Sequence, residues 1–283
     1  MSSRAMSLKA RIRNYAKQNK LTAQVVQQNY MFERFLARLS VSGYRDRFVI
    51  KGGILIASIV GLDTRSTMDL DATLRDLPLT EENVLKAVKE IGAVDLHDGV
   101  FFEEKSISPI RKDDVYGGFC VRIDAVYDTI ITPLSIDIST GDIITPGAEL
   151  YELTGIFDEE PRILLWGYNI ETILAEKAES VLNRGIYNTR IRDYYDLYIL
   201  TTTRRFDRQV FEEALAATAK HRGSGDNIRD RRSILDSIAA SSDLRKMWEK
   251  YRQRFAYAKD IEFDEILKAL DDLFLESSRK KPE

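Results

Sequence analysis

FVIKGGILIASIV, at residues 48–60, and MDLDATL, at residues 68–74, together decide the fold of this chain. The first three residues form a short apolar run that is typical of a buried strand and that ends just before Gly52 and Gly53. The apolar segment after the glycines predicts a short buried helix. Residues 68–74 then alternate apolar and polar side chains, which is the period-2 pattern of a second strand. We therefore expect a core of strand, Gly-Gly turn, helix and strand.

Two carboxylates stand on the second of these strands. Asp69 and Asp71 are two residues apart, so their side chains project from the same face of the strand. Neighbouring carboxylates repel each other unless a cation neutralises them. A third, Asp137, is the lone charge in the apolar strand segment SIDIS at residues 135–139. Such oxygen ligands suit Mg²⁺, with Mn²⁺ as an alternative ion, so the sequence predicts a metal site of Asp69, Asp71 and Asp137.

Gly52 and Gly53 lie between a strand and a helix, where backbone N–H groups can approach a phosphate at the positive end of the helix dipole. A Gly-Gly pair alone is weak evidence, because any tight turn uses it. The order of glycines, paired carboxylates and a third strand carboxylate is more specific. It indicates a site for a metal-bound triphosphate, in which the third carboxylate helps to activate an attacking hydroxyl.

The rest of the chain predicts an α+β protein. Ser7 and Thr22 are candidate caps of two N-terminal helices, and Thr80 of a third at residues 81–91. Further strands are expected at residues 101–107, 119–127 and 134–139, and residues 141–155 are expected to form a long loop. Helices follow at about residues 170–184, 190–202, 207–220, 228–240, 242–257 and 262–277, with a loop at 221–226. We expect two domains, residues 1–165 with the mixed sheet and residues 166–283 all helical.

Charge and composition narrow the class of protein. The 283 residues carry a net charge of −3, but residues 1–47 carry +8, residues 48–183 carry −14 and residues 184–254 carry +6. An acidic centre with basic flanks suits an enzyme that holds a metal–nucleotide and grips a polyanion, although solvated helix faces give such a split as well. The single Cys120 excludes an internal disulfide, and two histidines argue against a histidine metal site. No run approaches the roughly 20 apolar residues of a membrane span, so we expect a cytoplasmic protein without a membrane partner.

Four blocks of sequence resemble the nucleotidyltransferase-fold toxins of the AbiEii/AbiGii family, which includes the MenT toxins. The first block joins residues 51–55 to the Asp-x-Asp segment at 65–71, and the second is residues 136–138 with Gly141-Asp142 and Thr145-Pro146. The third is AEKAE at residues 175–179, and the fourth is NTRIRDYYDLY at residues 188–198. Together the blocks cover about residues 48–200, in the family's order and spacing.

The resemblance implies a polymerase-beta-like nucleotidyltransferase fold with a mixed sheet, N-terminal helices and a helical C-terminal half that completes the active site. It also implies a bacterial enzyme that moves a nucleoside monophosphate from an NTP to an acceptor hydroxyl. In this family the acceptor is typically the 3′ end of tRNA, and the outcome is growth arrest or abortion of phage infection. The antitoxin partner is typically encoded next door and need not bind stably.

The same resemblance assigns roles to individual residues. Asp69 and Asp71 would hold the metal, and Asp137 would orient or deprotonate the acceptor hydroxyl. Lys177 would offset the charge of the triphosphate, and Asp193 is the helical carboxylate expected to take part in catalysis. The expected nucleotide-binding residues are Lys51, Gly52, Gly53, Arg65, Thr67, Lys177, Arg190 and Asp196.

Simpler interpretations of these residues remain open from the sequence. Lys177 could be a solvated helix residue, and Arg65 and Thr67 could only shape the entry to the strand. Asp193 and Asp196 could pair with nearby arginines. The tyrosines of the fourth block fit a helix core better than a base-stacking surface; they are Tyr194, Tyr195 and Tyr198.

Three functions remain open as well. One is transfer to RNA, a second is transfer to a protein or small-molecule acceptor, and the third is non-catalytic NTP binding by a regulator. An extended polyanion would be favoured if the basic side chains of the N-terminal helices faced the site. These side chains are Arg11, Arg13, Lys17, Arg34 and Arg38.

Overall fold

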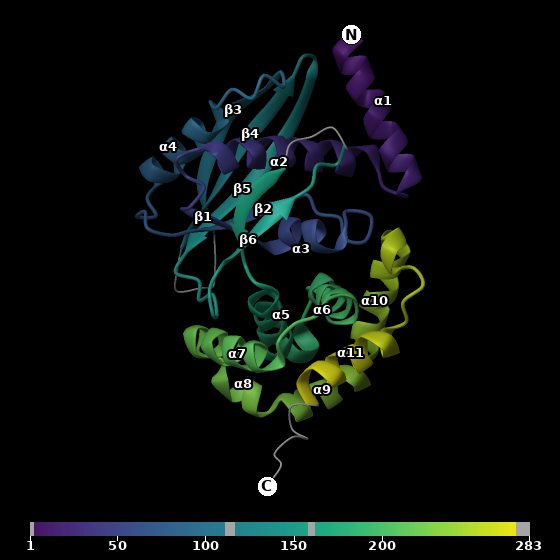
Figure 1. The fold of residues 1–283 in the computed structure, drawn as a ribbon. Helices are drawn as coiled ribbons and strands as arrows, with labels where there is room; N and C mark the ends of the chain where they lie inside the picture. Colours follow the sequence, from purple (N-terminus) through teal and green to yellow (C-terminus); the bar gives the residue numbers. More distant parts are fainter. Residues whose placement is uncertain (1–2, 111–116, 158–161, 276–283) are drawn as a thin grey trace. The chain divides into compact units, whose positions relative to one another are not determined.

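The computed structural model describes residues 3–110, 117–157 and 162–275, and the chain forms two compact units. Unit 1 comprises residues 1–142 and 148–168, and unit 2 comprises residues 143–147 and 169–283. The chain therefore passes into unit 2 for five residues before it returns to complete unit 1. Figure 1 shows the elements of both units along the sequence.

Unit 1 begins with two helices, α1 (Ser3–Gln18) and α2 (Ala23–Val41). Thr22 caps α2 as predicted, since its hydroxyl accepts a hydrogen bond of 3.2 Å from the backbone N–H of Val25. The predicted cap at Ser7 is wrong, because α1 starts one turn earlier. Ala5 extends the buried face of α1 toward the N-terminus and is fully buried, so the helix gains packing by starting earlier.

A seven-stranded mixed sheet forms the centre of unit 1, in the order β3-β4-β5-β2-β1-β7-β6. The β2–β5 and β1–β7 pairs are parallel and the other pairs are antiparallel, which confirms the expected α+β class with a mixed sheet. The strands are β1 (Phe48–Lys51), β2 (Leu70–Leu74), β3 (Val100–Ile110), β4 (Gly118–Tyr127), β5 (Ile130–Thr140), β6 (Glu149–Leu153) and β7 (Ile163–Gly167).

Helices cover one face of this sheet. The helix predicted after the glycines is α3 (Gly52–Val60), and the one predicted after Thr80 is α4 (Glu81–Gly92). Helix α2 packs on β5 and β7, and α4 packs on β3. Figure 1 shows α2 crossing the sheet. In β5, the alternate residues Leu134, Ile136 and Ile138 are buried on the side of α2. The intervening residues point to the opposite face, which carries the polar residues considered below.

Strand β6 overturns part of the loop expected at residues 141–155. This strand pairs only with β7, so it is an edge strand, and its ELYEL sequence leaves both glutamates exposed. An edge strand pairs with a neighbour on one side only, and most of β6 is exposed to solvent. Its sequence therefore lacks the apolar pattern that marks the central strands. Strand β7, ILLWG, had not been predicted either.

Unit 2 contains seven α-helices among its described residues, in agreement with the helical C-terminal half that was expected. One difference is that the helix expected at residues 228–240 is divided in two, and the preceding loop is shorter than expected. Gly223 ends the helix before it in a left-handed conformation, with φ of 69°. The helices are α5 (Ile170–Arg184), α6 (Ile191–Thr203), α7 (Arg208–Arg222), α8 (Gly225–Arg229), α9 (Arg231–Ala240), α10 (Ser242–Arg254) and α11 (Phe263–Leu275), with short 3₁₀ turns η1 (Gly185–Tyr187) and η2 (Ala256–Ala258).

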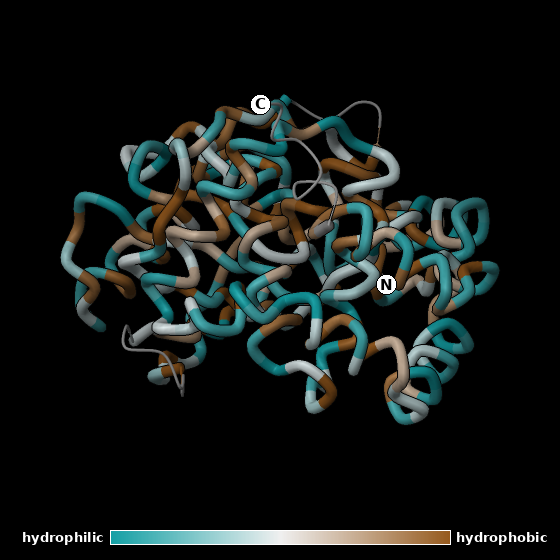
Figure 2. Tube along the Cα trace, turned by 90° about the horizontal axis from the view of Figure 1, so that it is seen from below, coloured by the Kyte–Doolittle hydropathy of each residue, from teal (hydrophilic) through white to brown (hydrophobic). Residues whose placement is uncertain are grey.

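Apolar and polar residues alternate along the helices, as the brown and teal segments of Figure 2 show. In unit 2 the buried positions include Tyr194 and Leu197 of α6, Phe211 of α7 and Trp248 of α10. Such spacing buries one side of each helix and leaves the other in solvent. No helix in the described part of the chain is long and apolar enough to cross a membrane.

Candidate active site

A row of polar residues crosses the face of the sheet opposite α2 and α4 in unit 1. Lys51 of β1 pairs with Asp71 of β2, and Asp71 pairs in parallel register with Asp137 of β5. Side chains of directly paired residues lie on the same face of a sheet. Two of the three predicted metal-binding carboxylates are therefore neighbours on adjacent strands, and the lysine lies next to them.

Asp69 lies just before β2 and not within the strand as predicted, because β2 begins at Leu70. Side chains of α2 take the backbone carbonyls that a longer strand would use. Asn29 donates a hydrogen bond of 2.7 Å to the carbonyl of Thr67, and Gln28 donates one of 2.9 Å to the carbonyl of Met68. Asp69 is consequently an exposed residue directly before the first residue of β2 and two positions before Asp71.

The glycines at the start of α3 make close contact with this loop and strand. A Cβ atom on Gly52, whose φ is +66°, would overlap with Oδ2 of Asp71, and a Cβ on Gly53 would lie 2.5 Å from the hydroxyl oxygen of Thr67. Only glycine fits at either position without displacing these side chains. Lys51 precedes α3 and gives it no side-chain cap. The N-terminus of α3 thus begins directly against Asp71, where N–H groups of a first turn can bind an anion.

Arg65 and Thr67 are both buried in the segment that leads to Asp69. A guanidinium nitrogen of Arg65 donates a hydrogen bond of 2.6 Å to the carbonyl of Ser66, within the same segment. The hydroxyl oxygen of Thr67 lies 3.4 Å from both the backbone N and the backbone O of Asp69. These contacts favour the interpretation that the two residues shape the entry to β2, and their binding of nucleotide stays a prediction.

Lys51 is held in a polar network that the sequence did not reveal. Its ammonium lies 2.5 Å from Oδ2 of Asp142 and 2.8 Å from the hydroxyl of Ser139. Thr73 and Ser139 also donate hydrogen bonds to Asp142, at 2.6 and 3.0 Å. Burial alone would raise the pKa of Asp142, but the charge of Lys51 and these hydrogen bonds outweigh it and hold the pKa well below its ordinary value.

The only sequence signal for Asp142 was its place in the Gly141-Asp142 pair of the second block. Lys51 had been expected to bind nucleotide. In the structure the ammonium of Lys51 forms an ion pair with Asp142, and Lys51 itself lies on the strand next to Asp71, which pairs with Asp137.

A second cluster lies within unit 2 and joins α5 to α6. The ammonium of Lys177 lies 2.6 Å from Asp193 and 3.1 Å from Asp196, and Ser180 donates a hydrogen bond of 3.3 Å to Asp193. Asp196 is fully buried and Asp193 is 5% exposed. Lys177 is therefore not an ordinary solvated residue, and the two aspartates pair with this lysine. The three residues predicted from the helical blocks do come together.

The remaining residues of the fourth block occupy different positions. Arg190 is exposed just before α6, and its backbone N–H donates a hydrogen bond of 2.9 Å to the side chain of Asn188. Tyr194 and Tyr195 are fully buried, as the core interpretation predicted, whereas Tyr198 is only partly so. Burial raises the pKa of Tyr194 far above its ordinary value, and the neighbouring charge of Asp193 adds to the effect. Tyr194 thus stays neutral in the folded protein.

The residues of unit 1 fit a hard divalent ion by their chemistry. Asp71 and Asp137 offer carboxylate oxygens from neighbouring strands, and Mg²⁺ commonly binds one or two carboxylates together with substrate phosphates. Within the described residues no group of three or more histidine, cysteine, aspartate or glutamate side chains comes together as a metal site. The participation of Asp69 therefore stays a prediction.

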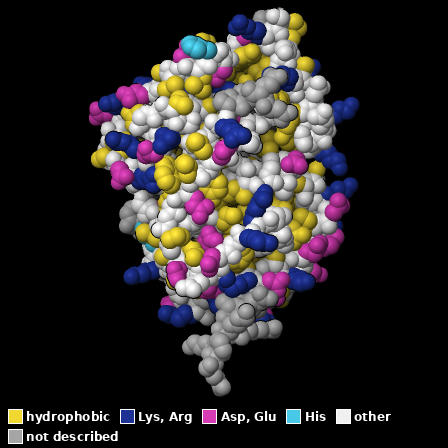
Figure 3. Space-filling model, in the orientation of Figure 1, with side chains coloured by type: hydrophobic (Ala, Val, Ile, Leu, Met, Phe, Trp, Pro, Cys, Tyr) yellow, Lys and Arg dark blue, Asp and Glu magenta, His cyan; other side chains and the backbone are white. Residues whose placement is uncertain are grey.

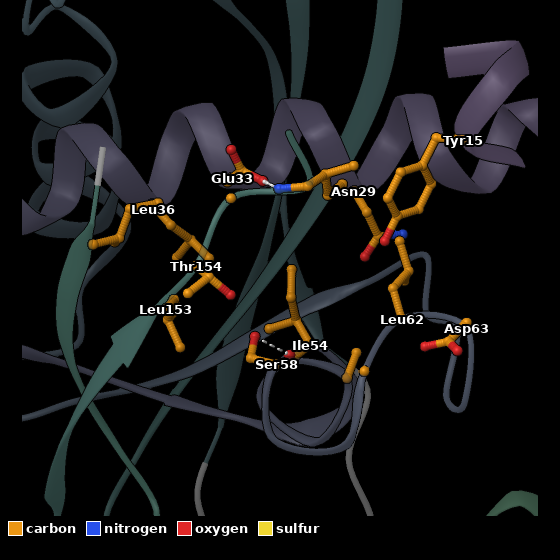
Figure 4. A pocket seen from close by; sticks show the side chains of 15 residues that line it. Tyr15, Asn29, Glu33, Leu36, Ile54, Ser58, Leu62, Asp63, Leu153 and Thr154 are labelled. Carbon is orange, nitrogen blue, oxygen red and sulfur yellow. Dashed lines mark hydrogen bonds between the residues drawn. The ribbon is translucent and has the colours of Figure 1, made fainter. Parts of the chain in front are cut away.

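A cavity of about 190 Å³ lies elsewhere in unit 1, between α2, α3 and the residues that follow β6 (Figure 4). Glu33 borders it and accepts a hydrogen bond of 2.6 Å from the backbone N–H of Ile156, and the hydroxyl of Ser58 bonds to the carbonyl of Ile54. None of the predicted site residues lines this cavity. Helix α3 thus borders the cavity along its length and presents its N-terminus to Asp71.

Comparison with known proteins identifies the family. Residues 34–269 match the family described as nucleotidyl transferase AbiEii toxin, type IV TA system. No match was found among curated proteins. A Helicobacter pylori protein solved as a candidate nucleotidyltransferase aligns with a TM-score of 0.51 and 18% identity over 93% of this chain and 100% of its own. The structure of JHP933 from Helicobacter pylori aligns with a TM-score of 0.50 and 17% identity over 92% of this chain and 95% of its own.

These two structures share the fold with this chain, and the family match covers the sheet, both carboxylate clusters and most of unit 2. The expected resemblance and the expected fold are thereby confirmed. The chain belongs to the AbiEii family of nucleotidyltransferase toxins from type IV toxin–antitoxin systems.

Proposed function

We propose that the chain is a Mg²⁺-dependent toxin that transfers a nucleoside monophosphate from an NTP to the 3′ hydroxyl of tRNA in the cytoplasm. The observation that carries this proposal is the pairing of Asp71 with Asp137 on adjacent strands, with the N-terminus of α3 packed against Asp71. This arrangement offers carboxylates and backbone N–H groups side by side. A metal-bound triphosphate needs both.

Each group in unit 1 has a distinct task in this proposal. Asp69, Asp71 and Asp137 hold the divalent ion, with Mn²⁺ as an alternative, and the ion offsets negative charge on the phosphates. The N–H groups of Gly52 and Gly53 bind phosphate oxygens. The acceptor hydroxyl attacks the α-phosphorus while its proton passes to Asp137, the bond to the pyrophosphate oxygen breaks and pyrophosphate leaves. The Lys51–Asp142 pair supports the strand ends that carry these residues.

The cluster in unit 2 supplies a cation to the same reaction. The side chain of Lys177 is 21% exposed, and Asp193 and Asp196 fix the position of its ammonium. We propose that Lys177 contacts the triphosphate as a point charge and that the two aspartates position it. Arg190 is an exposed arginine close to this cluster in the chain and is proposed as a further phosphate contact.

The distribution of basic residues bears on the nature of the acceptor. Arg34 and Arg38 of the N-terminal helices are buried, and Arg38 pairs with Asp98 at 2.7 Å, so these two side chains serve the core of unit 1. The excess of basic residues between positions 184 and 254 favours a polyanionic acceptor. The family match supports a neighbouring antitoxin as a partner. Growth arrest and abortion of phage infection are the proposed outcomes.

A transfer assay tests the proposal. The protein is incubated with each labelled NTP in turn, Mg²⁺ and total RNA, and we expect label in tRNA from the wild type and none from Asp71→Asn. Asp128→Asn is a matched control, because this exposed residue lies in the β4–β5 turn and its left-handed φ of 55° tolerates asparagine. Label in proteins or small molecules would show that the acceptor is not RNA. NTP binding without any transfer would show that the protein is a regulator and not an enzyme.

A further inference from the structure

Half-buried aromatic rings and arginines meet where the end of α10 and η2 pack against the start of α6. We call this the Arg–Phe patch, and it consists of Arg192, Arg254, Phe255 and Tyr257. The rings of Phe255 and Tyr257 are stacked, with centroids 5.3 Å apart and an interplanar angle of 20°. Tyr257 in turn lies 4.9 Å from the buried ring of Tyr195 in α6. The rings are therefore anchored to the core of unit 2.

Two guanidinium groups converge on the Phe255 ring. The central carbon of Arg192 lies 5.8 Å from the ring centroid, and that of Arg254 lies 5.3 Å from it. Such cation–π contacts restrict a long side chain without neutralising its charge. Because both groups lie over one ring, two positive charges are held within about 11 Å of each other, about one Debye length at 0.1 M salt.

Neither of these arginines has a carboxylate partner among the residues that the structure describes. Other arginines of the same region do: Arg252 pairs with Glu249 and Glu262 at 2.6 Å, and Arg245 pairs with Asp264 at 2.8 Å. Over the face shown in Figure 3, dark blue cations are generally interspersed with magenta carboxylates. Two positioned and unneutralised guanidinium groups at one ring therefore point to an anionic ligand.

We propose that the Arg–Phe patch binds the phosphate backbone of a single-stranded polynucleotide. An arginine presents its donors in a planar fork that matches phosphate oxygens, and prior restriction of the side chain lowers the entropy lost on binding. Two such groups fit consecutive phosphates of a strand. The partly exposed rings of Phe255 and Tyr257 offer an aromatic edge for the bases, which is the usual combination in proteins that bind single strands.

This inference rests on the proposed function and adds to it a place for the acceptor. Arg192 precedes Asp193, which pairs with Lys177. The patch and the lysine proposed to contact the triphosphate are therefore both tied to the first turn of α6, within the same unit. The patch is proposed to bind the acceptor and not the NTP. Substitution of its arginines should therefore weaken the affinity for RNA and leave the affinity for NTP unchanged.

Direct binding tests the inference without NTP or metal. The probe is a fluorescent single-stranded RNA oligonucleotide, and its Kd is measured by anisotropy at several salt concentrations. We expect Arg192→Gln and Arg254→Gln each to raise Kd about tenfold, because each removes a charge-assisted hydrogen bond to phosphate. The slope of log K against log salt should become shallower by about 0.7 for each phosphate that the variant no longer binds. Phe255→Leu keeps both charges but releases the guanidinium groups, and a smaller decrease in affinity is expected.

Arg205→Gln is the matched control. Arg205 is exposed and follows the opposite end of α6, about 20 Å from Arg192 along a helix of 13 residues. It removes the same charge, so its Kd and salt slope should stay close to those of the wild type. Thermal melting of each variant shows that it folds, and glutamine keeps most of the side-chain stem. If an arginine variant nevertheless melts early, Phe255→Leu decides the question.

The outcomes separate this inference from the proposed function. If Arg192→Gln and Arg254→Gln bind RNA like Arg205→Gln, or if the wild type binds no RNA at low salt, the patch is not a polynucleotide site. Transfer of label to RNA would still support the proposed function in that case. Conversely, RNA binding that depends on these arginines, combined with no transfer to RNA, would overturn the proposed function and leave the patch as a binding site.

Discussion

At Gly52 the backbone of α3 begins against the carboxylate of Asp71, so this position tests the phosphate-binding arrangement at the scale of one residue. Gly52→Ala places a Cβ atom where it overlaps with Oδ2 of Asp71, at a φ of +66°. We expect loss of nucleotide transfer and a decrease of about 1–3 kcal/mol in the free energy of unfolding. The transfer assay and urea denaturation measure the two effects.

Gly43→Ala is the control for this change. Nothing lies within 4 Å of a Cβ at Gly43, and its φ is not positive. It should retain transfer activity and stability. Full activity of Gly52→Ala would show that the contact between α3 and Asp71 is not required.

Asp142 determines a pH dependence of unit 1. Its pKa is lowered in the folded protein, so its contribution to stability is present above the unfolded pKa of about 3.9 and is lost as the pH falls below that value. We expect the free energy of unfolding of the wild type to fall more steeply between pH 5 and pH 3 than that of Asp142→Asn. At pH 7 the variant should be less stable by about 1–3 kcal/mol, because Lys51 is left without its partner. The free energy of unfolding is measured by urea titration at each pH. An equal decrease between pH 5 and pH 3 in the wild type and Asp142→Asn would contradict this assignment.

The individual site residues could be predicted from the sequence to the extent that local pattern defines them. Asp71 was found because it forms an Asp-x-Asp pair with Asp69, and Asp137 because it is the lone charge in an apolar strand. Asp142 was missed because its partners, Lys51 and Thr73, are distant in the chain and are brought to it only by the order of strands in the sheet. A carboxylate in a loop carries no sign of such partners.

At the scale of elements, the pair of α5 and α6 tests whether Lys177 is structural or catalytic. Lys177→Met leaves Asp193 and Asp196 as two buried carboxylates without their cation. We expect unit 2 to lose about 3 kcal/mol of stability, together with nucleotide transfer. Urea denaturation followed by tryptophan fluorescence in a Trp166→Phe background reports on this unit, because Trp248 is then the one tryptophan of the sequence and is buried in unit 2.

A triple variant separates the two roles. Lys177→Met combined with Asp193→Asn and Asp196→Asn removes the unpaired charges, so much of the stability should return. Transfer should remain lost, because the proposed cation is still missing. Recovery of both stability and transfer would show that Lys177 has only a structural role.

Elements were predictable where one signal acts locally. Thr22 and Thr80 cap their helices as expected, because an N-cap bonds within its own first turn. Strand β6 was missed because its pairing partner, β7, supplies the information that its own five residues lack. The strand at Asp69 was predicted too long, because Asn29 and Gln28 of α2 take the carbonyls that a strand partner would use. Both of these strand errors concern a partner outside the element itself.

Across the whole molecule, the location of a charge matters more than its contribution to the net charge of −3. Residues 1–47 carry +8, yet Arg34 and Arg38 are almost completely buried. Arg38 donates hydrogen bonds of 2.9 and 2.7 Å to Asp98 and a third of 2.7 Å to the carbonyl of Val100. The charge of this arginine is neutralised inside unit 1, whereas the charges of Arg192 and Arg254 have no carboxylate partner in the described part of the chain.

Arg38→Gln and Arg192→Gln change the net charge equally, and they should have opposite effects. Arg38→Gln should lower the free energy of unfolding by about 3 kcal/mol, because it leaves Asp98 half-buried without its cation, and it should leave the affinity for RNA and its salt slope unchanged. Arg192→Gln should weaken RNA binding and reduce the salt slope at nearly unchanged stability. Urea denaturation and anisotropy on both proteins measure all four quantities. A loss of RNA affinity in folded Arg38→Gln would indicate that the N-terminal helices take part in RNA binding. An unchanged affinity in this variant, together with a loss in Arg192→Gln, supports RNA binding by unit 2.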